Sequence, residues 1–547
     1  MFCYQCEQTV NGTGCLTVGN CGKDADTAAL QDILMYTARI AARYAHRARQ
    51  LGASDKSVDI FIIEALFTTV TNVAFDPERL VKDIHRGADM AVAAKRMYDA
   101  ACEARGVTPE ELPCPRVCDL KTDKDTLLKM ADKYGLETRC SIVGKDAMGL
   151  QELMTYGLKG AAAYLEHARM LGYEDDSLYA AIVEGLSFVE SEPTDVPTLL
   201  EKCLWVGEIN LKVMALLDQA NTGAYGDPVP TEVNVNPVPG KAIVVSGHDL
   251  KDLEALLEQT AGKGINVYTH GEMLPAHGYP KLKAYPHLVG NYGGAWQVQG
   301  TEFKAFPGAI LMTTNCIQRP ATDYADRIFT CGLVSWPGVK HISDRDFTPV
   351  IESALAAPGF TQEMPEKRIL VGFGRNTLLS NAEAILKGFS EGKLRHIFLI
   401  GGCDGALHGR NYYTELATSV PDDCLVMTLA CGKYRFNKLE FGTAAGFPRL
   451  LDVGQCNDAY SAIVTASALA DALNCGVNDL PLSLVLSWYE QKAVAVLLTL
   501  LHLGIKNIRL GPTLPAFLTP AAVQVLVDMF NIQPTTTADQ DLKAILG

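Results

Sequence analysis

The chain of 547 residues lacks the features that mark secreted, membrane-spanning and nucleic-acid-binding proteins. Its first residues, MFCYQCEQTV, carry neither the basic segment nor the apolar segment of a signal peptide. The longest apolar run, AVAVLLTLL, is too short to cross a bilayer. Basic side chains are in the minority, since 48 Lys and Arg stand against 63 Asp and Glu and give a formal net charge of −15. We therefore expect a cytoplasmic protein whose partners include neither a membrane nor a nucleic acid.

Nucleotide-binding motifs are missing as well. The sequence contains no Walker A pattern, and the glycines of LVGFGRN, residues 370–376, supply only a G-x-G fragment of the dinucleotide fingerprint. We therefore predict no nucleotide cofactor.

Cysteine, by contrast, is abundant. In a long chain without an export signal, 16 cysteines indicate metal or redox chemistry rather than a disulfide scaffold. Cys3, Cys6, Cys15 and Cys21 follow the spacing C-x2-C-x8-C-x5-C within one loop, and four such thiolates can hold a [4Fe–4S] cluster or a zinc ion. Zinc sites more often contain two C-x2-C pairs, so the single pair here favours iron and sulfur. Such a cluster would serve as an electron inlet.

A sequence repeat follows this loop. Residues 30–52 and 150–172 align without gaps at an offset of 120, with apolar residues at helical spacing and a glycine after each segment. The repeat predicts two small antiparallel helical bundles. The other cysteines are expected to be structural or core residues: Cys102, Cys114, Cys118, Cys140, Cys203, Cys331, Cys424 and Cys475.

The spacing of apolar residues changes from helical to strand-like after the repeat. A Pro- and Gly-rich segment, residues 223–240, reads as a linker, and short apolar runs separated by helical segments then indicate parallel sheets. We therefore expect a multidomain α and α/β protein. Its parts would be an iron–sulfur loop plus duplicated bundles over 1–222, a first α/β domain over 241–366 and a second over 367–547.

Potential metal ligands follow the ends of several predicted strands. Cys403, Cys431 and Cys456 come after apolar runs of the last domain, and His248, Glu272 and Cys316 do so in the preceding one. In open α/β sheets the ligand site lies beyond the carboxyl ends of the strands. Any one of these residues has an ordinary structural explanation, but the shared position favours a shared metal site.

The seventh candidate, Glu490, gives a set of four thiols, two carboxylates and one imidazole. Thiolates suit iron bound to sulfide, whereas carboxylate and imidazole suit iron bound to oxygen, so the set indicates a mixed cluster with an iron open to a small N–O or O–O substrate. Lys492 could supply a proton or a positive charge there, although the spacing alone also fits a surface lysine at a helix start.

Taken together, the cysteine quartet and the motifs SGHDLKD, YTHGEMLPA, GNYGG, TTNC, GCDG, ACGKYR, GQCND and WYEQKAVAVLL resemble the hybrid cluster protein family, also called the prismane or hydroxylamine reductase family. The resemblance implies a duplicated helical domain followed by two Rossmann-like domains. It implies a [4Fe–4S] cluster on the quartet and a hybrid [4Fe–2O–2S] cluster between the domains, with Cys403 as a persulfide and Lys492 beside the cluster. By motif, the hybrid-cluster ligands are His248, Glu272, Cys316, Cys403, Cys431, Cys456 and Glu490.

The activity implied is the two-electron reduction of hydroxylamine to ammonia and water, with an electron-donor protein as partner. Glu490, Lys492 and Glu272 are the expected catalytic residues, and His270 and His277 are weaker candidates for proton donation. Alternatives remain open: nitric oxide reduction or protein nitrosation on the same cluster, a nickel-containing carbon monoxide dehydrogenase, a non-catalytic redox or nitrogen-stress sensor, and a structural zinc protein.

Overall fold

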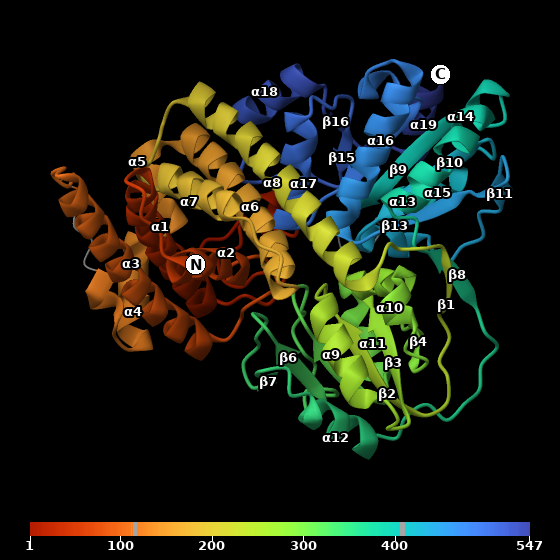
Figure 1. Cartoon of the computed structure of the whole chain (residues 1–547), viewed down its shortest axis with the longest axis horizontal. Helices are drawn as coiled ribbons and strands as arrows, with labels where there is room; N and C mark the ends of the chain where they lie inside the picture. The colour runs from red at the N-terminus through yellow and green to blue at the C-terminus, as the bar shows by residue number, and fades with distance from the viewer. Residues whose placement is uncertain (111, 113–116, 405–410) are drawn as a thin grey trace.

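The computed structural model describes residues 1–547 except 111, 113–116 and 405–410. Figure 1 shows a helical region on the left, one sheet with its helices at the lower right and a second at the upper right. The long helix α8 crosses the middle of the molecule between them. This arrangement confirms the expected fold class, in which duplicated helices precede two parallel sheets.

The helical region consists of two units of three long helices, and the second unit repeats the first at the offset read from the sequence. The first unit comprises α1 (Ala25–Gln50), α2 (Lys56–Thr68) and α3 (Pro77–Arg105), and the second comprises α6 (Lys145–Met170), α7 (Asp176–Glu190) and α8 (Val196–Tyr225). Side chains of Asp24, Asp55 and Asp76 cap the first three, which satisfies backbone N–H groups that the helix itself cannot pair. Two shorter helices, α4 (Lys124–Met130) and α5 (Leu136–Val143), join the units.

The first sheet has six parallel strands in the order β4-β3-β2-β5-β6-β7. The strands are β2 (Lys241–Ser246), β3 (Ile265–His270), β4 (Leu288–Asn291), β5 (Ala309–Met312), β6 (Ile328–Cys331) and β7 (Lys340–Ile342), and the helices with them are α9 (Leu250–Thr260), α10 (Pro280–Lys283), α11 (Gln299–Ala305) and α12 (Thr348–Ala356). The strand order reverses between β2 and β5, which is where such sheets bind their ligands.

The second sheet also has six parallel strands, in the order β13-β10-β9-β14-β15-β16. They are β9 (His396–Gly402), β10 (Cys424–Leu429), β13 (Leu450–Gly454), β14 (Leu482–Ser487), β15 (Arg509–Gly511) and β16 (Gln533–Pro534). Its helices are α13 (Arg375–Ser380), α14 (Ala382–Ser390), α15 (Tyr412–Ser419), α16 (Ala459–Leu473), α17 (Gln491–His502), α18 (Pro520–Phe530) and α19 (Ala538–Leu546), and a hairpin joins β11 (Thr443–Ala444) to β12 (Phe447–Pro448). The order reverses between β9 and β14.

The segment expected to be a linker contains a strand. β1 (Thr231–Asn234) pairs antiparallel with β8 (Arg368–Val371), so this segment and the start of the last predicted domain lie side by side. The division at residues 222, 240 and 366 stays a prediction.

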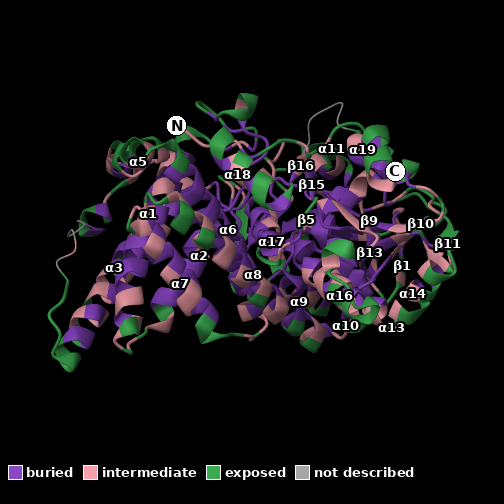
Figure 2. Ribbon diagram, turned by 90° about the horizontal axis from the view of Figure 1, so that it is seen from above, coloured by how far each residue is buried: buried purple, intermediate pink, exposed green. Residues whose placement is uncertain are grey.

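One apolar core joins the helical region to the second sheet. Helix α17 packs against both α6 and α8, and its buried Val494, Leu498 and Leu501 belong to the same cluster as the residues of the bundles. In Figure 2 much of the ribbon around α6, α17 and β9 is coloured as buried. The start of α17 is thereby held in the interior. No helix among the described residues is both long enough and apolar enough to cross a membrane.

Candidate metal centres

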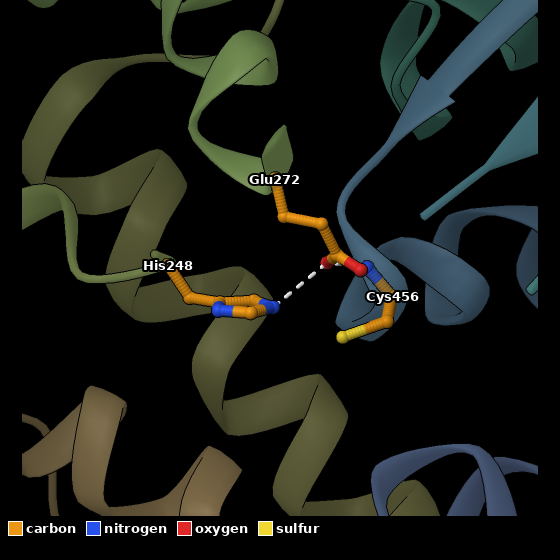
Figure 3. A group of neighbouring side chains, drawn as sticks. All are labelled: His248, Glu272 and Cys456. Atoms are coloured by element: carbon orange, nitrogen blue, oxygen red, sulfur yellow. Dashed lines mark hydrogen bonds and ion pairs between the residues drawn. The ribbon is translucent and has the colours of Figure 1, made fainter. Parts of the chain in front are cut away.

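Three predicted ligands meet where the two sheets face each other. His248 follows β2, Glu272 lies in the 3-10 helix η4 (Gly271–Gly278) after β3, and Cys456 opens η7 (Cys456–Asp458) after β13. One ligand atom from each lies within 4.8 Å of the others, and all three side chains are buried. The imidazole Nε2 of His248 is 3.0 Å from Oε2 of Glu272, and Figure 3 shows the three side chains pointing toward one another.

Backbone contacts fix this geometry across the two sheets. The amide of Cys456 donates to Oε2 of Glu272 at 2.9 Å. The side-chain amide of Gln455 donates to the carbonyl oxygens of His248 and Glu272, at 3.1 and 2.7 Å. A residue of the second sheet thus holds both ligand loops of the first.

The other three predicted thiols lie beside this group. Cys431 begins the 3-10 helix η6 (Cys431–Arg435), and its sulfur is 3.5 Å from Oε1 of Glu272. Cys316 and Cys403 share one buried cluster with Cys431. Cys403 follows Gly402, the last residue of β9. Gly402 has a φ of +112°, and a Cβ at this position would clash with the carbonyl oxygen of Ser487, so only glycine fits here.

Glu490 and Lys492 complete the group from the first turn of α17. Glu490 caps this helix by accepting a hydrogen bond from the backbone N–H of Lys492 at 2.9 Å. The ammonium of Lys492 is 2.9 Å from Nε2 of His248 and donates to Oδ1 of Asn315 at 3.0 Å. Lys492 is only 1% exposed, so the alternative of a surface lysine is wrong.

The pKa values show how these groups depend on one another. Burial, together with nearby carboxylates, raises the pKa of the Cys403 and Cys431 thiols well above the usual range. Burial also raises the pKa of Glu490. The pKa of Glu272 is lowered in spite of burial, because His248, Lys492 and the amide of Cys456 stabilise its charge.

The donor set suits a metal cluster. Burying several thiols and two carboxylates around one lysine is unfavourable unless a cation compensates their charge. Two more polar side chains lie close to the group. The Tyr164 hydroxyl interacts with Cys456, and the ring of His167 lies 6.2 Å from the His248 ring, with no hydrogen-bond partner for its nitrogens among the described residues. The residues present therefore fit a mixed sulfur- and oxygen-ligated cluster.

The N-terminal quartet forms a separate group next to the first. Cys3 and Cys15 pair through their backbones, with N···O distances of 3.2 and 2.8 Å. Cys6, Cys15 and Cys21 are buried, and the pKa of the Cys6 thiol is raised well above its usual value by burial and by the other three sulfurs. The four sulfurs therefore lie close enough for the other three to influence the charge of Cys6.

Packed aromatic rings connect the two groups. Trp296 stacks on Tyr489 with the ring centres 4.0 Å apart, and both share a buried cluster with Cys6 and with Cys316, Cys403 and Cys431. The Tyr489 hydroxyl donates to Asn72 at 2.7 Å, and its carbonyl oxygen accepts from the amide of Glu7 at 2.9 Å. Buried residues in contact with one another therefore link Cys6 of the quartet to the second group.

The sequence of the whole chain places it in a family. A model of the Prismane/CO dehydrogenase family matches residues 1–543. The chain belongs to this family. It is 56% identical over 551 residues to a hydroxylamine reductase of Burkholderia lata, 54% over 545 residues to one of Rhodospirillum rubrum and 53% over 550 residues to one of Geobacter sulfurreducens. Each alignment covers 100% of this chain and 99% or 100% of the relative.

Two solved structures share the fold. A carbon monoxide dehydrogenase from Thermococcus sp. AM4 matches with a TM-score of 0.55 and 17% identity, over 100% of this chain and 89% of that one. Carbon monoxide dehydrogenase IV from Carboxydothermus hydrogenoformans gives 0.56 and 16%, over 99% and 92%. At such low sequence identity, the comparison shows a shared fold and nothing more.

Sequence reasoning missed several residues of the site. Asn315 and Gln455 lie inside the quoted motifs or next to a ligand, so their proximity to ligands was a usable signal. Tyr164 and His167 lie in the repeat, where helical periodicity made them look like packing residues. Nothing in the sequence indicates that this face of α6 meets His248.

Other expectations have mixed outcomes. His270 binds Ser246 and Glu302, and His277 binds Thr269, so both imidazoles have partners within the first sheet. The remaining cysteines divide by burial. Cys102, Cys203, Cys331 and Cys424 are buried and Cys140 is partly exposed, whereas Cys118 and Cys475 are exposed, so the core assignment of Cys475 is wrong. Cys114 lies outside the described residues.

Proposed function

We propose that this chain is a hydroxylamine reductase, an oxidoreductase that converts hydroxylamine, two electrons and two protons into ammonia and water. One observation carries the proposal: the Lys492 ammonium contacts His248 inside a buried set of four thiols, two carboxylates and an imidazole. The full-length identity of more than half to curated hydroxylamine reductases supports it.

The cofactors proposed are two iron–sulfur clusters. Cys3, Cys6, Cys15 and Cys21 would hold a [4Fe–4S] cluster, and His248, Glu272, Cys316, Cys403, Cys431, Cys456 and Glu490 would hold a hybrid [4Fe–2O–2S] cluster. When bound, these clusters would supply the two electrons and an iron site for the substrate. The aromatic pair Trp296–Tyr489 would lie between them, and an electron-donor protein would dock near the quartet.

The chain's own residues would handle the protons and the charge. Lys492 holds a proton on Nζ, and its pKa is raised because Cys456, Glu490 and Glu272 outweigh the effect of burial. Its position between His248 and Asn315 leaves it aimed at the site. Glu490 is proposed as a second proton donor, since burial favours its protonated form. The buried surroundings exclude bulk water from the substrate.

Turnover and cofactor content test this proposal together. Anaerobically purified protein should reduce hydroxylamine with a reduced viologen dye and form stoichiometric ammonia. Protein that contains both clusters but forms no ammonia would contradict the proposed activity while leaving the cofactors in place.

Cys403 is proposed to carry a persulfide. Mass spectrometry should find one extra sulfur atom on the peptide with Cys403, and cyanide should remove it. The matched peptide with Cys424, a buried thiol at the start of β10, should carry none. An unmodified Cys403 would contradict the assignment.

One feature favours nitric oxide as a second candidate substrate. An apolar cavity of about 160 Å³ lies against Cys403 and Cys456, and its lining includes many aliphatic residues of β14, α16 and α17. Such a lining suits a small uncharged gas better than a hydrogen-bonding substrate. Comparing kcat/KM for nitric oxide and hydroxylamine on one preparation would rank the two.

A further inference from the structure

A second buried polar cluster lies beside the N-terminal quartet, and the repeat explains its composition. Asp32 and Arg39 of α1 recur at the offset of 120 as Glu152 and Lys159 of α6. All four line one internal cavity of about 40 Å³, and Cys3 lines the same cavity. The duplication has therefore placed two equivalent acid–base pairs around one point next to the quartet.

Positive charge predominates in this cluster. Lys23 and Arg139 also line the cavity, which gives four cationic side chains against the two acids Asp32 and Glu152. Arg139 donates to Glu152 at 2.9 Å, and Lys23 donates to the side chain of Gln31 at 2.6 Å. The Nε of the buried Arg39 has no partner among the described residues. A cluster ligated by four thiolates is net negative, so the excess of cations compensates it.

Asp32 is the group of this cluster best placed to change its charge. Its side chain faces the cavity, and burial raises its pKa to about 7, an effect that Glu152 increases and that Lys23, Lys159 and Arg39 oppose. Glu152 is in contrast fixed in an ion pair with Arg139. A negative charge added nearby favours protonation of an acid.

The cavity shares part of its wall with a larger cleft. A cleft of about 770 Å³ between the two helical units shares Arg39, Tyr134 and Arg139 with the cavity lining. The rest of the cleft lining includes charged residues of α1 and α7, among them Arg43, Arg47 and Glu184. A proton from water in this cleft would reach the cavity past the side chains that the two share.

We propose that Asp32 takes up the proton that accompanies reduction of the iron–sulfur centre on the quartet. The centre gains one electron from a low-potential donor, and a carboxylate oxygen of Asp32 gains one proton from cleft water, forming an O–H bond. The net charge of the buried region is then unchanged, which eases electron entry. This inference rests on the proposed cofactor of the quartet.

The test is the midpoint potential of the N-terminal centre as a function of pH. EPR-monitored redox titration of the holoenzyme should show a potential that falls by up to about 59 mV per pH unit above pH 7, since one proton accompanies one electron. In Asp32→Asn the potential should be independent of pH in this range. The control Asp26→Asn, at the start of the same helix and paired with Lys124 at the surface, should keep the wild-type slope.

A second variant keeps the proposal open to contradiction if Asp32→Asn fails to fold. Glu152→Gln removes a charge that raises the pKa of Asp32, so the pH-dependent range should move to lower pH with its slope intact. A slope that persists in Asp32→Asn would overturn the proposal and assign the proton to Lys159, whose pKa is lowered to about 8. A pH-independent wild-type centre would also overturn it. A quartet with no reducible centre would instead contradict the proposed function.

Discussion

At the scale of single residues, the site is organised by charge compensation. Lys492 is the one cationic side chain described within hydrogen-bonding distance of His248, and it lies among groups that are acidic or become anionic when they bind metal. The same ammonium also reaches Asn315, which fixes its direction. A residue that both balances charge and carries a proton should be sensitive to any substitution.

Replacing Lys492 by Met should lower hydroxylamine turnover strongly. The apolar stem is kept and the ammonium is lost, so we expect kcat to fall by about 10² to 10⁴, the usual contribution of a positioned acid. Iron content should stay near that of the wild type, and it would be measured on the same sample. Lys506→Met removes an exposed lysine after α17 and should change nothing. Wild-type kcat in Lys492→Met would remove this residue from the mechanism.

Glu490→Gln should also reduce turnover, by at least about tenfold if the carboxyl donates a proton. The amide can still accept the cap hydrogen bond from the backbone of Lys492, so α17 should keep its start. Steady-state assays with matched iron content would show this, and Glu258→Gln, on the exposed side of α9, serves as the control. Unchanged turnover with an intact cluster would exclude Glu490 as the donor.

The sequence predicted some residues of the site better than others. Cys456 and Glu272 follow strands and lie in recognisable motifs, so their grouping could be expected. The burial of Lys492 could not, because it depends on α17 being covered by α6 and α8, which lie far away in sequence. The polar role of Asp32 was hidden for the same reason, since its partners come from α6 and from the N-terminal loop.

At the scale of elements, periodicity predicts the helices well and the turns after the strands poorly. The repeat offset of 120 relates α1 to α6 without error in their bounds. In contrast, η4, η6 and η7 were not expected, although each carries or borders a ligand. Their short 3-10 turns have no apolar period of their own, and contacts such as those of Gln455 define them.

The contact between α6 and α17 yields a test at this scale. A Cβ on Gly160 would lie 2.6 Å from the carbonyl oxygen of Gln491 and 3.0 Å from the Cα of Lys492. Gly160→Ala should therefore push the start of α17 away from the site. We expect a loss of about 1–3 kcal/mol from overpacking, larger than the gain in helix propensity, together with reduced turnover.

Thermal unfolding and activity of the holoenzyme would measure both effects. Gly300→Ala is the matched control, because this residue of α11 has open space where its Cβ would stand, and its unfolding temperature should be unchanged or slightly raised. A Gly160→Ala protein as stable and active as the wild type would show that the contact can relax.

At the scale of the whole molecule, the proposed hybrid cluster joins the two sheets, which the chain connects through an exposed segment. Its proposed ligands come from both sheets and from the start of α17, whereas the segment between α12 and β8 is exposed over residues 361–367. The sequence predicted the order of these parts. It could not predict that one apolar core would unite the helical region with the second sheet, because that core depends on contacts between distant residues.

Loss of iron should therefore loosen the molecule as a whole. Metal that binds only the folded state stabilises it, so apoprotein should unfold at a lower temperature than holoprotein. It should also be cut faster by protease, first within residues 361–367. Mass spectrometry of the fragments would locate the cuts, and identical fragment patterns with and without iron would contradict a cluster that bridges the sheets.

The most direct test of the account is the metal and sulfide content of anaerobically purified protein, with EPR of the same sample. We expect about eight irons per chain, less acid-labile sulfide than iron, no nickel or zinc in stoichiometric amount, and two distinct paramagnetic centres. Four irons with matching sulfide would leave only the centre on the quartet, and the buried group around His248, Glu272 and Cys456 would then need another explanation.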